Sequence, residues 1–126
     1  AESIKFSTLH VIAGSTGPQK AYLEMEIDGV ICSQESTGDG PVDATFNAIS
    51  EIVPHSARLQ LYQVHAVTEG TDAQAQVTVR LEEDGKTVNG QGADTDTLVA
   101  SAKAYINALN KLADKRSKTA PEMLSA

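Results

Sequence analysis

The chain contains an internal repeat, and this feature constrains its fold more than any other. Residues 19–27 alternate apolar and polar side chains, and residues 73–82 repeat that alternation about 54 residues later. Each alternating run leads to a second short run, then to a glycine-containing segment and an apolar pattern of helical period. Such self-similarity indicates two copies of one supersecondary unit, which must pack together to bury their apolar faces.

The first unit is predicted to contain three strands and a helix. Period-two alternation and neighbouring apolar runs indicate the strands, and the Asp28-Gly29 pair predicts a two-residue hairpin of the primed type. The helix is expected to open at Pro41, since proline is favoured at the first helical position, and to end before Pro54. The predicted strands are residues 5–13, 19–27 and 30–37.

The second unit repeats this order. Its Asp84-Gly85 pair predicts a second primed hairpin, and Thr95 or Asp96 is expected to cap its helix, because both are favoured N-cap types. Small residues keep this helix thin, which would allow close approach to a sheet or a partner. They are Ala100, Ser101, Ala102 and Ala104. The predicted strands are residues 59–68, 73–82 and 86–91, with a turn at residues 69–72.

The expected fold is α+β, with duplicated βββα units in two layers related by a pseudo-twofold axis. We place the repeats at about residues 4–54 and 58–113 of a single domain, residues 1–113, followed by a polar tail, residues 114–126, with no role in the core. Six strands present a large apolar face, and two helices are few to cover all of it. We therefore expect a dimer, the alternative being a monomer in which two helices suffice.

Composition excludes several classes of function. A formal net charge of -7 leaves no basic surface for nucleic acid. The single cysteine, Cys32, is expected to be a buried thiol, and the lack of a disulfide partner fits a reducing, cytoplasmic compartment. No apolar run approaches the ~20 residues that a membrane helix needs. Because the chain opens with Ala rather than Met, we expect a fragment of a longer protein.

No set of side chains suggests catalysis or a metal site. None of His10, His55 and His65 lies in a spacing typical of zinc sites. His10 and His65 fall in matching strands, one residue out of register, and are expected to be ordinary sheet or interface residues. Asp94 and Asp96 stand beside a helix start and are expected to be caps rather than metal ligands.

The glycines before the first helix indicate a different kind of site. Gly38 and Gly40 bring bare backbone to the helix N-terminus, where free N–H groups and the helix dipole favour an anion such as a carboxylate. Asp39 and Asp43 flank this position and would repel a dianion, so a zwitterion satisfies both demands. Alternatively, the glycines serve only the strand-to-helix turn. The apolar side chains that would suit an aliphatic ligand are Val42, Leu59 and Ala66.

A series of motifs runs in order along nearly the whole chain. They are Gly-Asp-Gly-Pro-Val-Asp-Ala at residues 38–44, Tyr62, His65-Ala66, Gly-Thr-Asp-Ala at residues 70–73, Asp96, and the alanine-rich run at residues 100–110. From about Ser3 to Leu112 this order resembles the C-terminal regulatory domain of 2-isopropylmalate synthases, a module that citramalate synthases also carry. The resemblance implies a duplicated βββα fold, in agreement with the repeat.

The resemblance implies regulation without catalysis. The family's enzyme condenses acetyl-CoA with 2-oxoisovalerate in a separate, metal-dependent barrel domain, so this chain would hold no catalytic residue, cofactor or metal. The family's module pairs with its twin as a homodimer and binds the end product, L-leucine, at the interface for feedback inhibition. The alternatives are an isoleucine-sensing module of a citramalate synthase and a purely structural dimerisation domain.

The resemblance also implies which residues bind the effector. Gly38, where the family has glycine too, would shape the loop. Tyr62 would supply an apolar wall and a hydroxyl, with plain sheet packing as the alternative. Family members vary in residue type at Asp43 and Leu59. The matching effector-binding positions are Asp39, Gly40, Pro41, Val42, Asp43, Leu59, Tyr62, Ala66 and Ala73.

Overall fold

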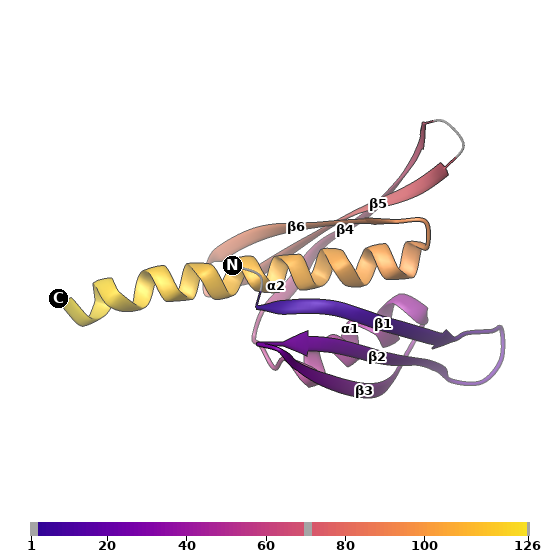
Figure 1. The fold of residues 1–126 in the computed structure, drawn as a ribbon, viewed down its shortest axis with the longest axis horizontal. Helices are drawn as coiled ribbons and strands as arrows, with labels where there is room; N and C mark the ends of the chain where they lie inside the picture. The colour runs from indigo at the N-terminus through magenta and orange to yellow at the C-terminus, as the bar shows by residue number, and fades with distance from the viewer. Residues whose placement is uncertain (1–2, 70–71, 126) are drawn as a thin grey trace.

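The chain folds into two βββα units in the predicted order (Figure 1). The structure is a computed structural model that describes residues 3–69 and 72–125. Within them lie two separate antiparallel sheets, ordered β1-β2-β3 and β4-β5-β6. The α+β duplication predicted from the repeat is therefore confirmed. The elements are β1 (Ile4–Ile12), β2 (Gln19–Ile27), β3 (Val30–Gly38), α1 (Pro41–Ile52), β4 (Arg58–Glu69), β5 (Asp72–Glu83), β6 (Lys86–Asp94) and α2 (Thr97–Ser125).

Both predicted hairpin turns are present. Asp28 and Gly29 have φ values of 50° and 85°, and Asp84 and Gly85 have values of 52° and 78°. Positive φ at both central residues defines the type I′ geometry, whose twist matches that of the flanking strands. The turn predicted at residues 69–72 falls partly outside the described residues.

Helix α2 is longer than its apolar pattern indicated. The polar tail predicted from residue 114 continues the helix as far as Ser125, and its last turns project beyond both sheets (Figure 1). Beyond the buried Leu112, the sequence Ala-Asp-Lys-Arg at residues 113–116 consists mostly of good helix formers, so the helix continues although the apolar pattern has ended. Apolar periodicity indicates burial and not helix propensity.

The core lies where the inner faces of the sheets meet the helices. Helix α1 packs on β2 and β3, whereas α2 packs on β5 and β6 and also touches β1, so that it lies between the two sheets (Figure 1). The alternating residues Ala21, Leu23 and Met25 are buried as predicted. Cys32 is only half-buried, contrary to expectation, because β3 is an edge strand of its sheet.

The thin face of α2 packs closely against β6, as its small residues predicted. A Cβ atom added at Gly90 would lie 2.7 Å from Cβ of Ala108. One added at Gly92 would lie 2.6 Å from the backbone nitrogen of Ala104 and 2.9 Å from Cβ of Lys103. These distances are far below van der Waals contact, so β6 permits this approach only with glycine at both positions.

Replacing Gly92 with alanine should destabilise the fold. The new methyl group must displace helix backbone rather than a flexible side chain, which typically costs about 1–3 kcal/mol. Gly14→Ala is the matched control, since its Cβ would meet nothing closer than 3.8 Å. Chemical denaturation of both variants checks this prediction, and equal midpoints would contradict it.

Asn110 joins the two units. Its Oδ1 accepts a hydrogen bond from the amide of Ile4 at 3.0 Å, and its Nδ2 donates to the carbonyl of Ile4 at 2.8 Å. The amide side chain thus pairs with the start of β1 as a neighbouring strand would. Asn107 makes a comparable but exposed contact, accepting from the amide of Gln91 on β6 at 2.9 Å. Helix α2 therefore satisfies the outer edges of two sheets at once.

Asn110→Ala should cost more stability than Asn107→Ala. The first change leaves two buried backbone groups of Ile4 without their partner, whereas the second exposes one amide to water. Unsatisfied buried groups cost about 1–3 kcal/mol, against about 1 kcal/mol for an ordinary hydrogen bond. Thermal unfolding of the two variants provides the comparison. A smaller effect at Asn110 would show that the units are held together elsewhere.

Candidate functional site

The N-terminus of α1 has no side-chain cap. Gly40 is the N-cap residue in an extended conformation, with φ -166° and ψ 174°, and Pro41 follows in the first turn without an N–H group. Helix α2 differs, because Oδ1 of Asp96 accepts hydrogen bonds from the amides of Leu98 at 2.7 Å and Val99 at 3.1 Å. Asp96 is thus the predicted cap of α2, whereas the first amides of α1 have no such acceptor.

Two aspartates stand beside this uncapped helix end. Oδ2 of Asp43 accepts a hydrogen bond from the backbone amide of Asp39 at 2.9 Å, which ties the loop to the first helical turn. The Nδ2 group of Asn47 approaches the same oxygen at 3.5 Å. Both aspartates are exposed. The site therefore places free amide hydrogens next to negative charge, the arrangement that a zwitterion complements.

Gly38 and Gly40 have different structural roles. A Cβ at Gly38 would lie 2.7 Å from Oδ2 of Asp43 and 2.8 Å from Cα of Ala44, and closer still to the amide nitrogen of Ala44. A Cβ at Gly40 would meet nothing within 4 Å. Gly38 therefore permits close packing of the β3 end against α1, whereas Gly40 keeps the helix entrance open.

Alanine substitutions should separate these roles. Gly38→Ala must push the end of β3 away from α1, and we expect a loss of about 1–3 kcal/mol in unfolding free energy. Gly40→Ala has space and an ordinary backbone conformation, and since alanine is only a poorer N-cap than glycine, its loss should stay below about 1 kcal/mol. Urea denaturation measures both, and a Gly40→Ala variant destabilised more than Gly38→Ala would contradict the assignment.

A β-bulge brings the predicted residues of β4 onto one face. The register shifts between Leu59 and Leu61, so that Leu59 pairs with Leu81 and Tyr62 pairs with Val79. In a regular strand, residues 59 and 62 would point to opposite faces. The extra residue in the bulge turns both toward the inner face, where Ala66 and Ala73 also lie.

Tyr62 connects three elements at this face. Its hydroxyl lies 2.8 Å from Oγ of Ser101 on α2, and its ring packs edge-on against Phe46 of α1 at 5.7 Å between centroids. Phe46 in turn packs against Tyr105 of α2, with the ring centroids 4.5 Å apart and the rings tilted by 36°. Tyr62 thus contacts a residue of α1 four positions beyond Val42. Ser101, predicted only as a small packing residue, is the polar partner of its hydroxyl.

A polar cluster that the sequence analysis missed joins α1 to α2 behind these aromatic rings. Nε2 of His55 lies 3.0 Å from Oγ of Ser50 and 3.1 Å from the hydroxyl of Tyr105, and Nδ1 accepts from the amide of Ala57 at 3.1 Å. Burial raises the pKa of Tyr105 above its usual value of 10.0. No sequence motif marks His55, because its partners come from three separate segments.

The predicted effector residues do not all meet in one chain. Those of the loop, from Asp39 to Asp43, lie together, and Val42 packs against the core. Leu59, Ala66 and Ala73 are exposed along the inner face. The hollows beside Arg58, His65, Phe6 and Tyr22 are lined by none of the predicted effector residues. Because Leu59, Ala66 and Ala73 are exposed, a single chain offers them as an open surface.

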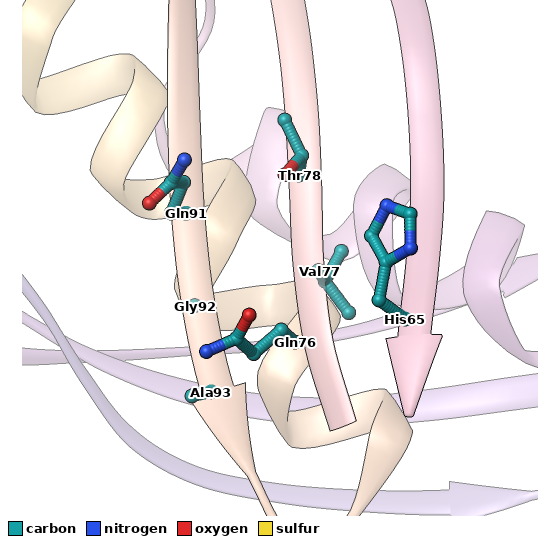
Figure 2. A pocket seen from close by; sticks show the side chains of 7 residues that line it. All are labelled: His65, Gln76, Val77, Thr78, Gln91, Gly92 and Ala93. Carbon is teal, nitrogen blue, oxygen red and sulfur yellow. The ribbon is translucent and has the colours of Figure 1, made fainter. Parts of the chain in front are cut away.

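The opposite face of the second sheet is polar. His65, Gln76 and Gln91 line a shallow hollow of about 240 Å³, and Figure 2 shows them on one side of the three strands with a helix behind. His65 pairs with Gln76 as His10 pairs with Tyr22, so the two histidines are in register between the units. The predicted offset of one residue is wrong, because the pairing of the strands and not residue spacing sets the equivalence. Both side chains are exposed.

No metal site is apparent in the described residues, where no three His, Cys, Asp or Glu side chains cluster. Asp94 serves the start of α2 instead. Its Oδ1 accepts from the amide of Asp96 at 2.9 Å, and its Oδ2 pairs with Lys103 at 3.0 Å. The amide first, and Lys103 second, lower the pKa of Asp94. Among the helices of this described part, none is both long and apolar enough to cross a bilayer.

Comparisons with known proteins identify the kind of domain. A protein-family model described as "LeuA allosteric (dimerisation) domain" matches residues 1–113. The 2-isopropylmalate synthase of Caulobacter vibrioides (strain NA1000 / CB15N) is 65% identical over 122 residues, 97% of this chain and 23% of that protein. Those of Bradyrhizobium sp. (strain ORS 278) and Rhodopseudomonas palustris (strain HaA2) are 62% and 55% identical, covering 91% and 99% of this chain and 22% and 24% of theirs. The chain thus spans under a quarter of these relatives.

Proposed function

The chain belongs to the family of LeuA allosteric (dimerisation) domains, and on that premise we propose that it binds L-leucine for feedback inhibition of an attached 2-isopropylmalate synthase. The chain would act as the non-catalytic, homodimeric part of an enzyme that condenses acetyl-CoA with 2-oxoisovalerate. The metal-dependent barrel that performs this reaction would lie in the remainder of the protein, and this domain would need no cofactor of its own.

The uncapped N-terminus of α1 is the observation that supports this proposal. An amino acid carries a carboxylate that the free amides and the helix dipole would stabilise, and an ammonium group that Asp39 or Asp43 would attract. The equivalent end of α2 is closed by Asp96. One effector per chain is therefore expected, despite the duplication.

The predicted effector residues of the loop and of the inner face of the second sheet suit an aliphatic side chain. Val42 packs at the edge of the core, and Tyr62 supplies an apolar ring held in place by Phe46 and Ser101. Ala66 and Ala73 are small and leave room on the inner face. A branched side chain of four carbons would gain apolar contact there without requiring a further polar partner.

Inhibition requires that leucine bind one arrangement of the domain better than another. Equal affinity for two states would shift nothing, whatever the strength of binding. Coupling of about 1–3 kcal/mol is typical for such control. Tyr62 is suited to transmit it, because it contacts α1 through Phe46 and α2 through Ser101.

Gly40→Asp should abolish leucine binding while leaving the fold at least as stable. An aspartate at the N-cap would accept hydrogen bonds from the first amides of α1, as Asp96 does in α2, and caps of this type stabilise helices by about 0.5–2 kcal/mol. The same carboxylate would occupy the amides and repel that of leucine. Isothermal titration calorimetry and thermal unfolding measure the two effects.

The control is Gly40→Ala, which adds a methyl group without a charge or an acceptor. It should keep most of the affinity for leucine. A loss of affinity in Gly40→Asp but not in Gly40→Ala would therefore indicate that the new carboxylate competes with leucine for the helix amides. Tight leucine binding by Gly40→Asp would refute the site. Titration with isoleucine in parallel tests the citramalate synthase alternative. If neither amino acid binds or raises the melting temperature, a purely structural dimerisation domain is the better description.

A further inference from the structure

A row of polar side chains on α2 follows the outer edge of β6. Lys103, Asn107, Lys111 and Lys115 are spaced four residues apart and therefore lie on one face of the helix. We call these four side chains the α2 polar stripe. Nζ of Lys103 pairs with Oδ2 of Asp94, at the end of β6, at 3.0 Å. The other three side chains bond to the backbone of the strand.

These three contacts fall on alternate residues of β6, the edge strand of its sheet. In an antiparallel pair, the N–H and C=O groups of a residue point to the same side, and this side alternates along the strand. The residues contacted by α2 therefore carry the backbone groups that point away from β5. The contacts join Oδ1 of Asn107 to the amide of Gln91 at 2.9 Å, Nζ of Lys111 to the carbonyl of Asn89 at 2.6 Å, and Nζ of Lys115 to the carbonyl of Thr87 at 2.9 Å.

The repeat distances of helix and strand explain how one helix can serve several residues of this edge. Four residues of an α-helix rise about 6.0 Å, and two residues of an antiparallel strand rise about 6.8 Å. Because α2 runs antiparallel to β6 (Figure 1), each further turn of the helix meets the next outward-facing residue of the strand. The short side chain of Asn107 stands beside the close contacts of Gly90 and Gly92, and the longer lysines follow.

Strand β6 has no protection of its own against pairing with another strand. Sheet edges attract further strands, and proteins block them with charges, prolines, bulges or a covering helix. Residues 87–93 contain no charged residue and no proline. In the described residues, the pairing of β6 with β5 has no register shift, whereas the edge strands β1 and β4 each contain one. Protection of the β6 edge therefore depends on α2.

We propose that the α2 polar stripe takes the place of a fourth strand along β6 and closes this edge to an extended segment of another chain. The stripe occupies the amide of Gln91 and the carbonyls of Asn89 and Thr87, which are groups that an added strand would use. Its lysines also place positive charge beside the edge, which repels the same edge of a second copy. This role is independent of leucine binding.

Removing the two lysine donors tests the proposal. The double variant Lys111→Met/Lys115→Met keeps the apolar stems but cannot donate to the carbonyls of β6. The matched control is Lys5→Met/Lys20→Met, because these lysines pair with carboxylates on the outer face of the first sheet. Thioflavin T fluorescence and light scattering of the 126-residue chain are followed over a range of concentrations. We expect fluorescent aggregates from the first variant at concentrations where wild type and the control form none.

A proline on the edge separates closure of the edge from a general effect on stability. The amide of Asn89 points away from β5, as its carbonyl does, so Asn89→Pro removes no backbone hydrogen bond of the sheet but blocks an added strand. Introduced into Lys111→Met/Lys115→Met, it should abolish the aggregation. If that double variant aggregates no more than its control, or if the proline leaves the aggregation unchanged, the proposal is wrong.

Hydrogen exchange of the wild-type chain gives a second test, which decides the matter should the lysine variant fail to fold. The amide of Gln91 has Asn107 as its acceptor, whereas the amide of Asn89 on the same edge meets no acceptor among the described residues. After correction for intrinsic rates, Gln91 should exchange about fivefold more slowly than Asn89, as expected for one hydrogen bond. Equal rates, measured by NMR, would show that the stripe does not cover the edge.

Discussion

The close packing of α2 on β6 is the contact on which the arrangement of the whole chain depends. Gly90 and Gly92 remove the side chains that would hold the helix away from the sheet, and alanines on α2 complete the fit. Because α2 packs this closely on β6, it fits between the two sheets, and the side chain of Asn110 hydrogen-bonds to the backbone of Ile4. A gap of about 0.5–1 Å already loses a quarter to a half of the dispersion attraction between packed surfaces, so a single methyl group on β6 would weaken the packing and with it the contact between the two units.

This packing also breaks the symmetry of the repeat. Because α2 covers β1 as well as its own sheet, the first unit is closed, while the inner face of β4 stays open. The N-termini of the two helices also differ. Asp96 caps α2, whereas Gly40 leaves the first amides of α1 without a side-chain acceptor. The two units are therefore similar in backbone, but only the first has an uncapped helix and only the second has an exposed apolar inner face on its first strand. The proposed effector site therefore lies where the two βββα units of the chain differ from each other.

Much of the fold followed from local patterns. Period-two alternation located β2, and the Asp-Gly pairs located both hairpins, because these signals depend on neighbours in sequence. The loop from Gly38 to Asp43 was also recognisable, since glycine followed by proline and aspartate is typical of a helix start. Three features escaped this reasoning: the length of α2, the bulge that turns Leu59 and Tyr62 to one face, and the cluster around His55. The exposure of Val64 was not predicted either, although Val64 alternates with Tyr62 and Ala66. Residue spacing does not distinguish a strand face that a helix covers from one that stays exposed.

By itself, the sequence determined the repeat, the order of strands and helices, and the presence of an uncapped, glycine-flanked helix start with two carboxylates beside it. These properties are local, and backbone conformation and hydrogen bonding within a few residues suffice to specify them. Only the tertiary structure decided which inner face α2 covers, which hydroxyl Tyr62 meets, and which apolar residues stay exposed. Those properties depend on how closely two surfaces approach, and that distance results from side chains far apart in the sequence acting together.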